Sequence, residues 1–147
     1  MYDERIVTPM RQELTRLGVQ EMRTPDEVDA KLKDARGTTL VVVNSVCGCA
    51  ARNARPAVAK ALQHAVKPDA MTTVFAGQDG PAVQRARSYF TGYPPSSPQI
   101  GLLKDGKLVF MLERHQIEGR TSDEIADDII GAFDRYCENP MSAQAMA

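Results

Sequence analysis

The chain has 147 residues, of which 43% are hydrophobic and 25% charged, and its formal net charge is −1. This composition is typical of a soluble globular protein, and the length is sufficient to bury a core. The near-neutral charge argues against nucleic-acid binding, which needs excess positive charge, and 5% aromatic residues without Trp argue against a base-stacking surface. No apolar run approaches the roughly 20 residues that cross a bilayer, and the first residues lack an apolar signal core. We therefore expect a cytoplasmic protein that binds neither nucleic acid nor membranes.

The expected organisation is one domain over residues 1–138. No internal repeat, low-complexity block or linker divides this stretch. Residues 139–147 contain Pro140 and small side chains and are expected to form a flexible tail. The sequence gives no indication of the oligomeric state.

Two helices are predicted before the first strand. Thr8-Pro9 marks the start of the first, since Thr can cap a helix and Pro suits its first position, and Gly18 marks its end. Thr24 and Glu27 have the spacing of a capping box, which predicts a second helix ending before Gly37.

The rest of the chain predicts an α/β fold. Residues 38–45 are β-branched and continuously apolar in their middle, which is typical of a strand buried on both faces. Asp105-Gly106 between two apolar runs predicts a hairpin, and Thr121 with Glu124 predicts another capped helix. The elements expected after the two helices are strand 38–45, helix 50–66 kinked at Pro56, strand 71–76, helix 81–90, a proline-rich loop 93–98, strands 99–104 and 107–113, and helix 121–136. This is the element order of a thioredoxin-like domain, with a central mixed sheet flanked by helices and a helical N-terminal extension.

Two of the three cysteines, Cys47 and Cys49, lie between the buried strand and the helix that follows it. The carboxyl ends of strands carry function in such sheets, and the free N–H groups of a helix N-terminus stabilise a thiolate. Arg52 and Arg55 on the helix would add positive potential. Gly48 allows a tight turn, so the two sulfurs can form a small, strained and readily reduced disulfide. The pattern therefore predicts a redox-active, catalytic cysteine pair.

Ser97-Pro98 is a second candidate element of the site. Pro98 comes directly before a predicted strand, and X-Pro bonds are where cis peptides mainly occur. In a thioredoxin-like fold, a cis-proline loop faces the redox cysteines and presents its backbone to the substrate. We therefore expect Gly48, Arg55, Ser97 and Pro98 to bind the substrate.

Two other interpretations of the cysteine pair are open. Cysteines are often simply small apolar core residues. Structural zinc usually takes four ligands, and the remaining candidates, Cys137, His64 and His115, are scattered along the chain. His115 is interpreted as a polar surface group and Cys137 as an inert thiol, because a helix C-terminus does not stabilise a thiolate. We expect no bound metal or cofactor.

Several blocks of the sequence, taken in order, resemble the bacilliredoxin family. A Cys-x-Cys alone is a weak signal, but this many blocks in the same order is a specific one. The blocks are 44–50 (NSVCGCA), 54–56 (ARP), 73–79 (TVFAGQD), 89–90 (YF), 95–98 (PSSP), 103–107 (LKDGK), 113–115 (ERH), 117–119 (IEG) and 136–137 (YC), and the similarity spans residues 5–138.

The resemblance implies a thioredoxin-like thiol–disulfide oxidoreductase that removes bacillithiol, its co-substrate, from S-thiolated cytosolic proteins. Cys47 would attack the bacillithiol sulfur, and Cys49 would resolve the resulting mixed disulfide. A reductase or a second small thiol would then recycle the enzyme. The family usually has glycine where this chain has Arg52, a difference that bears on the preferred thiol and the redox potential.

Two alternative functions remain at this point. A general protein disulfide reductase or isomerase would need both Cys47 and Cys49. A metal- or cluster-binding module would use the same two residues together with a partner subunit.

Overall fold

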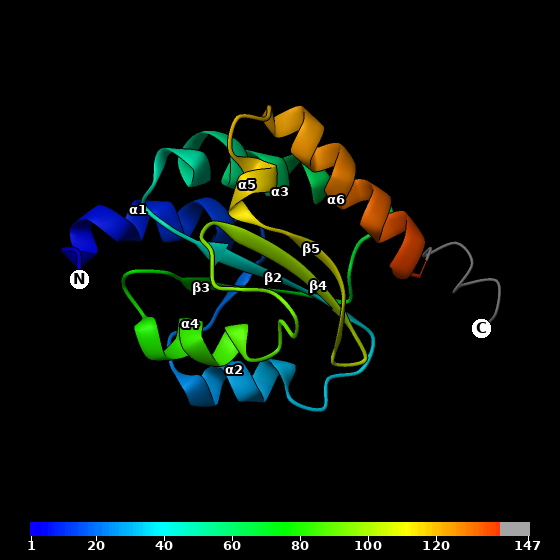
Figure 1. Cartoon of the computed structure of the whole chain (residues 1–147), viewed down its shortest axis with the longest axis horizontal. Coiled ribbons are helices and arrows are strands. Elements are labelled where there is room, and N and C mark those ends of the chain that lie inside the picture. Colours follow the sequence, from blue (N-terminus) through cyan, green and yellow to red (C-terminus); the bar gives the residue numbers. More distant parts are fainter. Residues whose placement is uncertain (139–147) are drawn as a thin grey trace.

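The computed structural model describes residues 1–138, in which five strands form a mixed sheet covered by helices on both faces (Figure 1). The strand order is β1-β3-β2-β4-β5. Strands β1 and β2 run parallel to β3, whereas β4 is antiparallel to β2 and β5 to β4. The strands are β1 (Gln20–Glu21), β2 (Thr38–Asn44), β3 (Ala70–Phe75), β4 (Gln99–Lys104) and β5 (Lys107–Leu112). The predicted mixed sheet is confirmed, and β1 is an addition too short to leave a pattern in the sequence.

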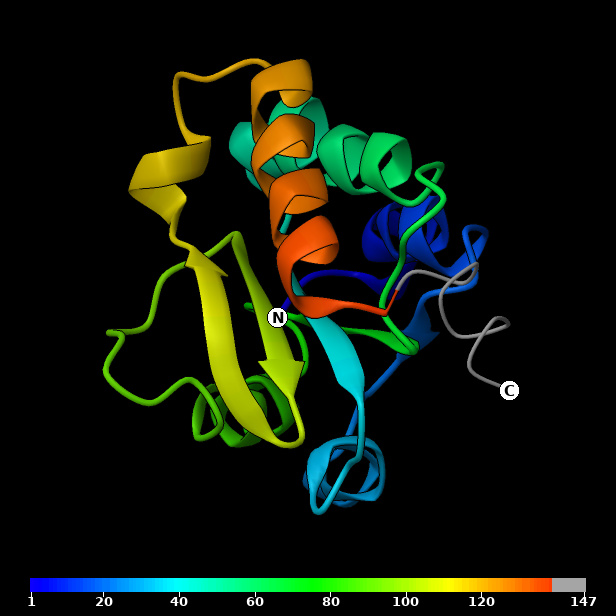
Figure 2. The ribbon, with the colours of Figure 1, turned by 90° about the vertical axis from the view of Figure 1, so that its right-hand side faces the viewer.

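The central strand β2 separates two apolar layers. Every residue of β2 is buried, and because successive side chains point to opposite faces, Leu40 and Val42 join one cluster while Val41 and Val43 join the other. The first cluster lies under α1 (Glu4–Thr15), α3 (Arg55–Ala61), α5 (Arg114–Ile117) and α6 (Ser122–Tyr136). The second lies under α2 (Pro25–Leu32) and α4 (Gly80–Arg87) (Figures 1 and 2).

Helix α1 begins at Glu4, five residues before Pro9, the predicted first helical position. The side chain of Asp3 accepts a hydrogen bond from the Arg5 N–H at 2.8 Å and so caps the helix, which the Thr-Pro pattern did not indicate. Thr8 and Pro9 therefore lie inside the helix.

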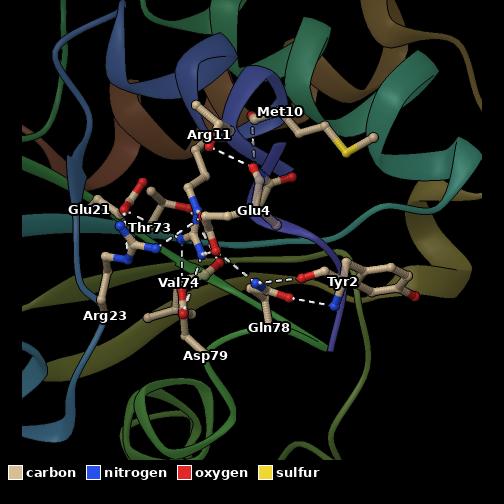
Figure 3. A network of polar contacts seen from close by, with 12 residues as sticks. Tyr2, Glu4, Met10, Arg11, Glu21, Arg23, Thr73, Val74, Gln78 and Asp79 are labelled. Atoms are coloured by element: carbon tan, nitrogen blue, oxygen red, sulfur yellow. Dashed lines mark hydrogen bonds and ion pairs between the residues drawn. The ribbon is translucent and has the colours of Figure 1, made fainter. Parts of the chain in front are cut away.

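A buried arginine ties α1 to the end of β3 (Figure 3). The Arg11 guanidinium donates to Glu4 at 2.8 Å and to Asp79 at 2.7 Å, and it lies 5.2 Å from the centre of the Phe75 ring. Gln78 adds hydrogen bonds to both backbone groups of Tyr2. This network fixes the N-terminal extension against the edge of the sheet at which β2 and β3 end.

The helix after the cysteines differs most from the prediction. It opens with a π-helical turn, η1 (Ala50–Ala54), and α3 stops at Ala61 rather than at residue 66. A kink was predicted at Pro56, and the structure has a π-helical turn just before it. The Arg55 N–H donates to the Ala50 carbonyl, five residues back, and Pro56 has no N–H to make the next helical hydrogen bond.

The remaining elements follow the sequence signals with small shifts. Asp105 and Gly106 both have positive φ, 50° and 80°, as the two-residue turn of the predicted hairpin requires. The capping box of Thr121 and Glu124 opens α6 as predicted. Helix α2 ends at Leu32, before Asp34 takes a left-handed conformation (φ 57°), and the short α5 was not predicted. The tail proposed for residues 139–147 lies outside the described residues, and no helix within residues 1–138 is long and apolar enough to span a membrane.

Candidate active site around Cys47 and Cys49

The cysteine pair lies where the buried strand β2 gives way to a helix. Strand β2 ends at Asn44, and the chain enters the helix at Cys47, whose carbonyl accepts the N–H groups of Ala50 and Ala51, both at 3.1 Å. Both cysteines are free thiols and half-buried. Both cysteines are therefore partly exposed residues at a helix N-terminus.

The surroundings of Cys47 favour its thiolate. Burial raises the pKa of this thiol, but hydrogen bonds from the Ser45 hydroxyl and from the backbone N–H groups of Ala50 and Cys49, with the charge of Arg114, outweigh it. The net effect is a lowered pKa. The Ser45 Oγ lies 3.1 Å from the Cys47 sulfur. Cys47 thus has the features of an activated nucleophile.

Arg114 is a site residue that the sequence reasoning missed. It lies at the start of α5, its Nη1 donates to the Ser97 carbonyl at 3.3 Å, and its charge stabilises the thiolate of Cys47. It belongs to the block 113–115 that resembles the family, but the only residue of that block given a role from the sequence was His115. That side chain is 73% exposed and is paired with Glu113 at 3.8 Å.

The Ser97-Pro98 peptide bond is cis, as expected. Val43 of β2 pairs with Gln99 of β4, so the residue before Gln99 lies beside the segment that leads from β2 to Cys47. Pro98 is buried and Ser97 half-buried. The loop therefore adjoins the cysteine segment from the β4 side, the side on which Arg114 holds the Ser97 carbonyl.

Arg55, expected to bind substrate, is turned into the protein instead. Its side chain is 3% exposed, and its Nη1 donates to the Asn44 Oδ1 at 3.0 Å and the Ser45 carbonyl at 2.8 Å. Its Nε lies 3.2 Å from a carboxylate oxygen of Glu13 in α1. The buried guanidinium of Arg55 therefore positions the backbone before Cys47, in place of the substrate-binding role expected from the sequence.

Arg52 behaves differently from Arg55. It is exposed, and its guanidinium folds back over Gly48 so closely that a Cβ added to Gly48 would lie 2.7 Å from Nη2. The glycine thus makes room for a cation directly over the turn that joins the two cysteines.

The other candidate residues are engaged elsewhere. Cys137 is buried, which raises the pKa of its thiol, and His64 Nε2 lies 2.8 Å from an Asp134 oxygen. Among residues 1–138, no group of three His, Cys, Asp or Glu side chains is arranged to hold a metal ion.

Solved structures with the same architecture define the class of fold. A thioredoxin of Malassezia sympodialis matches with a TM-score of 0.55 and 14% identity, over 80% of this chain and 90% of that one. A mutant thioredoxin of Halobacterium salinarum matches with a TM-score of 0.52 and 17% identity, over 81% and 90%. The fold is thioredoxin-like.

Sequence relatives are much more similar. A family described as "Disulphide isomerase" matches residues 2–137. A bacilliredoxin of Koribacter versatilis is 57% identical, over 93% of this chain and 94% of that protein. A bacilliredoxin of Salinibacter ruber is 56% identical, over 92% and 81%. The chain belongs to the bacilliredoxin family, and with its thioredoxin-like fold it is a thiol–disulfide oxidoreductase.

Proposed function

We propose that the protein reduces mixed disulfides between a low-molecular-weight thiol and the cysteines of cytoplasmic proteins, with Cys47 as the nucleophile. The observation that carries this proposal is the lowered pKa of Cys47 at the end of β2, where Ser45 and two backbone N–H groups stabilise its thiolate. Bacillithiol is the proposed small thiol, on the resemblance of the sequence to the bacilliredoxins.

The first step is a thiol–disulfide exchange. The Cys47 thiolate attacks the sulfur of the small thiol, a new S–S bond forms to Cys47, and the bond to the client protein breaks. The client cysteine leaves as a thiolate and takes a proton from solvent. Arg114 and the backbone N–H groups balance the negative charge that Cys47 carries before this exchange.

The second step returns the small thiol to solution. The Cys49 thiolate attacks the Cys47 sulfur, the small thiol leaves as a thiolate, and Cys47 and Cys49 form a disulfide. A dithiol reductase or two further small thiols then reduce this disulfide by the same exchange. The proposed partners are therefore S-thiolated proteins and a recycling reductant, and the proposed reaction requires no bound cofactor.

Intact-mass spectrometry of the reduced enzyme, mixed with a client protein that carries bacillithiol or glutathione, tests the proposal. Wild type should release the client thiol, and the Cys49→Ser variant should accumulate one small thiol per chain. Cys47→Ser should take up none. Uptake of the small thiol by Cys47→Ser at the rate of wild type would refute the assignment of the nucleophile. Loss of all client release in Cys49→Ser would favour a general dithiol reductase instead.

A further inference from the structure

A cavity of about 370 Å³ opens at the same edge of the sheet as the cysteine pair, on the face covered by α4. Its walls include Ala76 and Gly77 after β3, Gly80 at the start of α4, and Pro95 of the cis-proline loop. Arg87 is the charged residue among its lining residues. The volume is in the range of pockets that bind small molecules.

Arg87 lacks a carboxylate partner within residues 1–138. Its Nη2 donates to the Ser96 carbonyl at 2.7 Å and its Nε to the Gln99 Oε1 at 3.4 Å, and both acceptors are neutral. Asp79, close to the cavity in sequence, is already engaged by Arg11. Burial lowers the pKa of Arg87, because no opposite charge compensates the desolvation of its guanidinium.

One donor of Arg87 remains available. Nη1 makes no hydrogen bond among the described residues. It is also not buried without a partner, as Arg55 Nε is, so it is exposed to solvent. A half-buried guanidinium that lines a cavity with a free N–H pair is suited to a carboxylate, which binds such groups through charge-assisted hydrogen bonds.

Only a short stretch of chain separates the wall of the cavity from Cys47. The Ala76 N–H donates to the Asn44 carbonyl at 2.8 Å, so the cavity wall adjoins the end of β2. Cys47 comes three residues after Asn44, at most about 11 Å further along the chain. A tripeptide-sized thiol, about 10 Å long when extended, spans most of that distance when it is attached to the Cys47 sulfur.

We propose that this cavity, with Arg87 as its cation, binds a carboxylate of the small thiol while that thiol is exchanged at Cys47. The inference rests on the proposed function, since it names the chemistry of the thiol that the enzyme prefers: a small thiol that carries a carboxylate is favoured over a neutral one. Arg87 is then a specificity residue, in addition to its hydrogen bonds to the cis-proline loop.

The first test measures binding alone and does not require thiol–disulfide exchange. S-methylglutathione carries the carboxylates of glutathione but cannot exchange, and its binding is followed by NMR through the amide shifts of Gly77, Gly80 and Arg87. Shifts at these amides in wild type, lost in Arg87→Gln, support the proposal. Arg85→Gln is the matched control, since it removes the same charge from the same helix at a residue that pairs with Asp29 instead. Equal binding by wild type and Arg87→Gln, or no shift at these amides, would overturn the proposal.

The second test measures preference during turnover. One client protein is modified with glutathione or with glutathione diethyl ester, in which the carboxylates are masked. Wild type should show a kcat/KM about tenfold higher for glutathione, which corresponds to about 1.4 kcal/mol. Arg87→Gln should abolish this ratio, Arg87→Lys should retain part of it, and Arg85→Gln should leave it unchanged.

These outcomes separate three explanations. If Arg87 only holds the loop, or if the carboxylate comes from the client protein, Arg87→Gln slows both substrates equally, and the proposal is wrong. If wild type transfers neither small thiol, the proposed function fails, while the S-methylglutathione titration still decides whether the cavity binds carboxylates.

Discussion

Replacement of Ser45 by alanine is the most direct way to perturb the nucleophile. Burial raises the pKa of Cys47, and the Ser45 hydroxyl, 3.1 Å from the sulfur, is the strongest of the groups that lower it. A hydrogen bond to a charged group contributes about 1.5–3 kcal/mol, and we take the low end because sulfur is a diffuse acceptor. Losing about 1.4 kcal/mol reduces the thiolate fraction about tenfold at any pH below the pKa of Cys47.

The reaction rate changes by less than the thiolate fraction. A thiolate of higher pKa is also a better nucleophile, with a Brønsted coefficient of about 0.4–0.5, so each thiolate of Ser45→Ala reacts about threefold faster. Below the pKa values of both proteins, Ser45→Ala should therefore react about threefold more slowly than its parent. Above both, it should react about threefold faster, so the two pH–rate curves should cross.

Stopped-flow reaction with the neutral disulfide 4,4′-dithiodipyridine, in a Cys49→Ser background, measures these curves for Cys47. Ser45→Thr restores the hydroxyl and should return the curve toward that of the parent. Ser88→Ala removes an exposed hydroxyl that donates to the Arg85 carbonyl in α4, and should leave the curve unchanged. If the Ser45→Ala curve superposes on the parent curve at every pH, the hydroxyl does not stabilise the thiolate and the reasoning is refuted.

Three further predictions concern other parts of the structure. Arg114→Gln should raise the pKa of Cys47 and slow its reaction about 1.5-fold at neutral pH, because solvent screens this exposed charge and the thiolate of higher pKa is a better nucleophile. High salt should remove the difference between variant and parent. Arg55→Met removes the buried cation that holds Asn44 and Ser45, so it should reduce the free energy of unfolding by about 3 kcal/mol in urea titrations. Arg16→Met, on the exposed surface, is the control and should change this free energy little. Equal effects of the two substitutions would contradict the role given to Arg55. Gly101→Ala should lower the free energy of unfolding by about 2 kcal/mol, because the added Cβ would lie 2.8 Å from the Phe90 ring. Gly131→Ala, where a Cβ would meet no neighbouring atom, should stabilise α6 slightly. If Gly101→Ala is as stable as the parent, the Phe90 ring can move aside.

Local signals in the sequence account for the elements that were predicted well. The apolar run in β2, the Asp105-Gly106 turn and the capping box at Thr121 each depend on residues that are neighbours in the chain. The start of α1 was misplaced because Asp3 and Thr8-Pro9 are both acceptable starts. Contacts between residues far apart in the chain, such as those of Arg11 with Asp79 and of Gln78 with Tyr2, favour the longer helix.

The candidate site was predicted in part for the same reason. Cys47 and Cys49 belong to one short motif, separated by a single residue, and the position of Pro98 directly before a strand predicted the cis bond. Arg114 comes 67 residues after Cys47, and it reaches the site only because β5 and α5 carry it back to the Ser97 carbonyl. The block 113–115 marks this arginine by its resemblance to the family, but no pattern of charge or spacing indicates that it lies near the cysteines.

Arg52 and Arg55 show how a small departure from regular geometry changes what a residue does. Residues three apart in an α-helix lie on nearly the same face, and the sequence analysis expected both arginines to add positive potential near the cysteines. The π-helical turn of η1, which contains Arg52 and ends directly before Arg55, has more residues per turn and so rotates the second side chain relative to the first. As a result, one guanidinium covers Gly48 at the surface, while the other is buried against the backbone of Ser45. The same turn therefore supplies a cation that can meet substrate and a cation that holds the segment leading to the nucleophile.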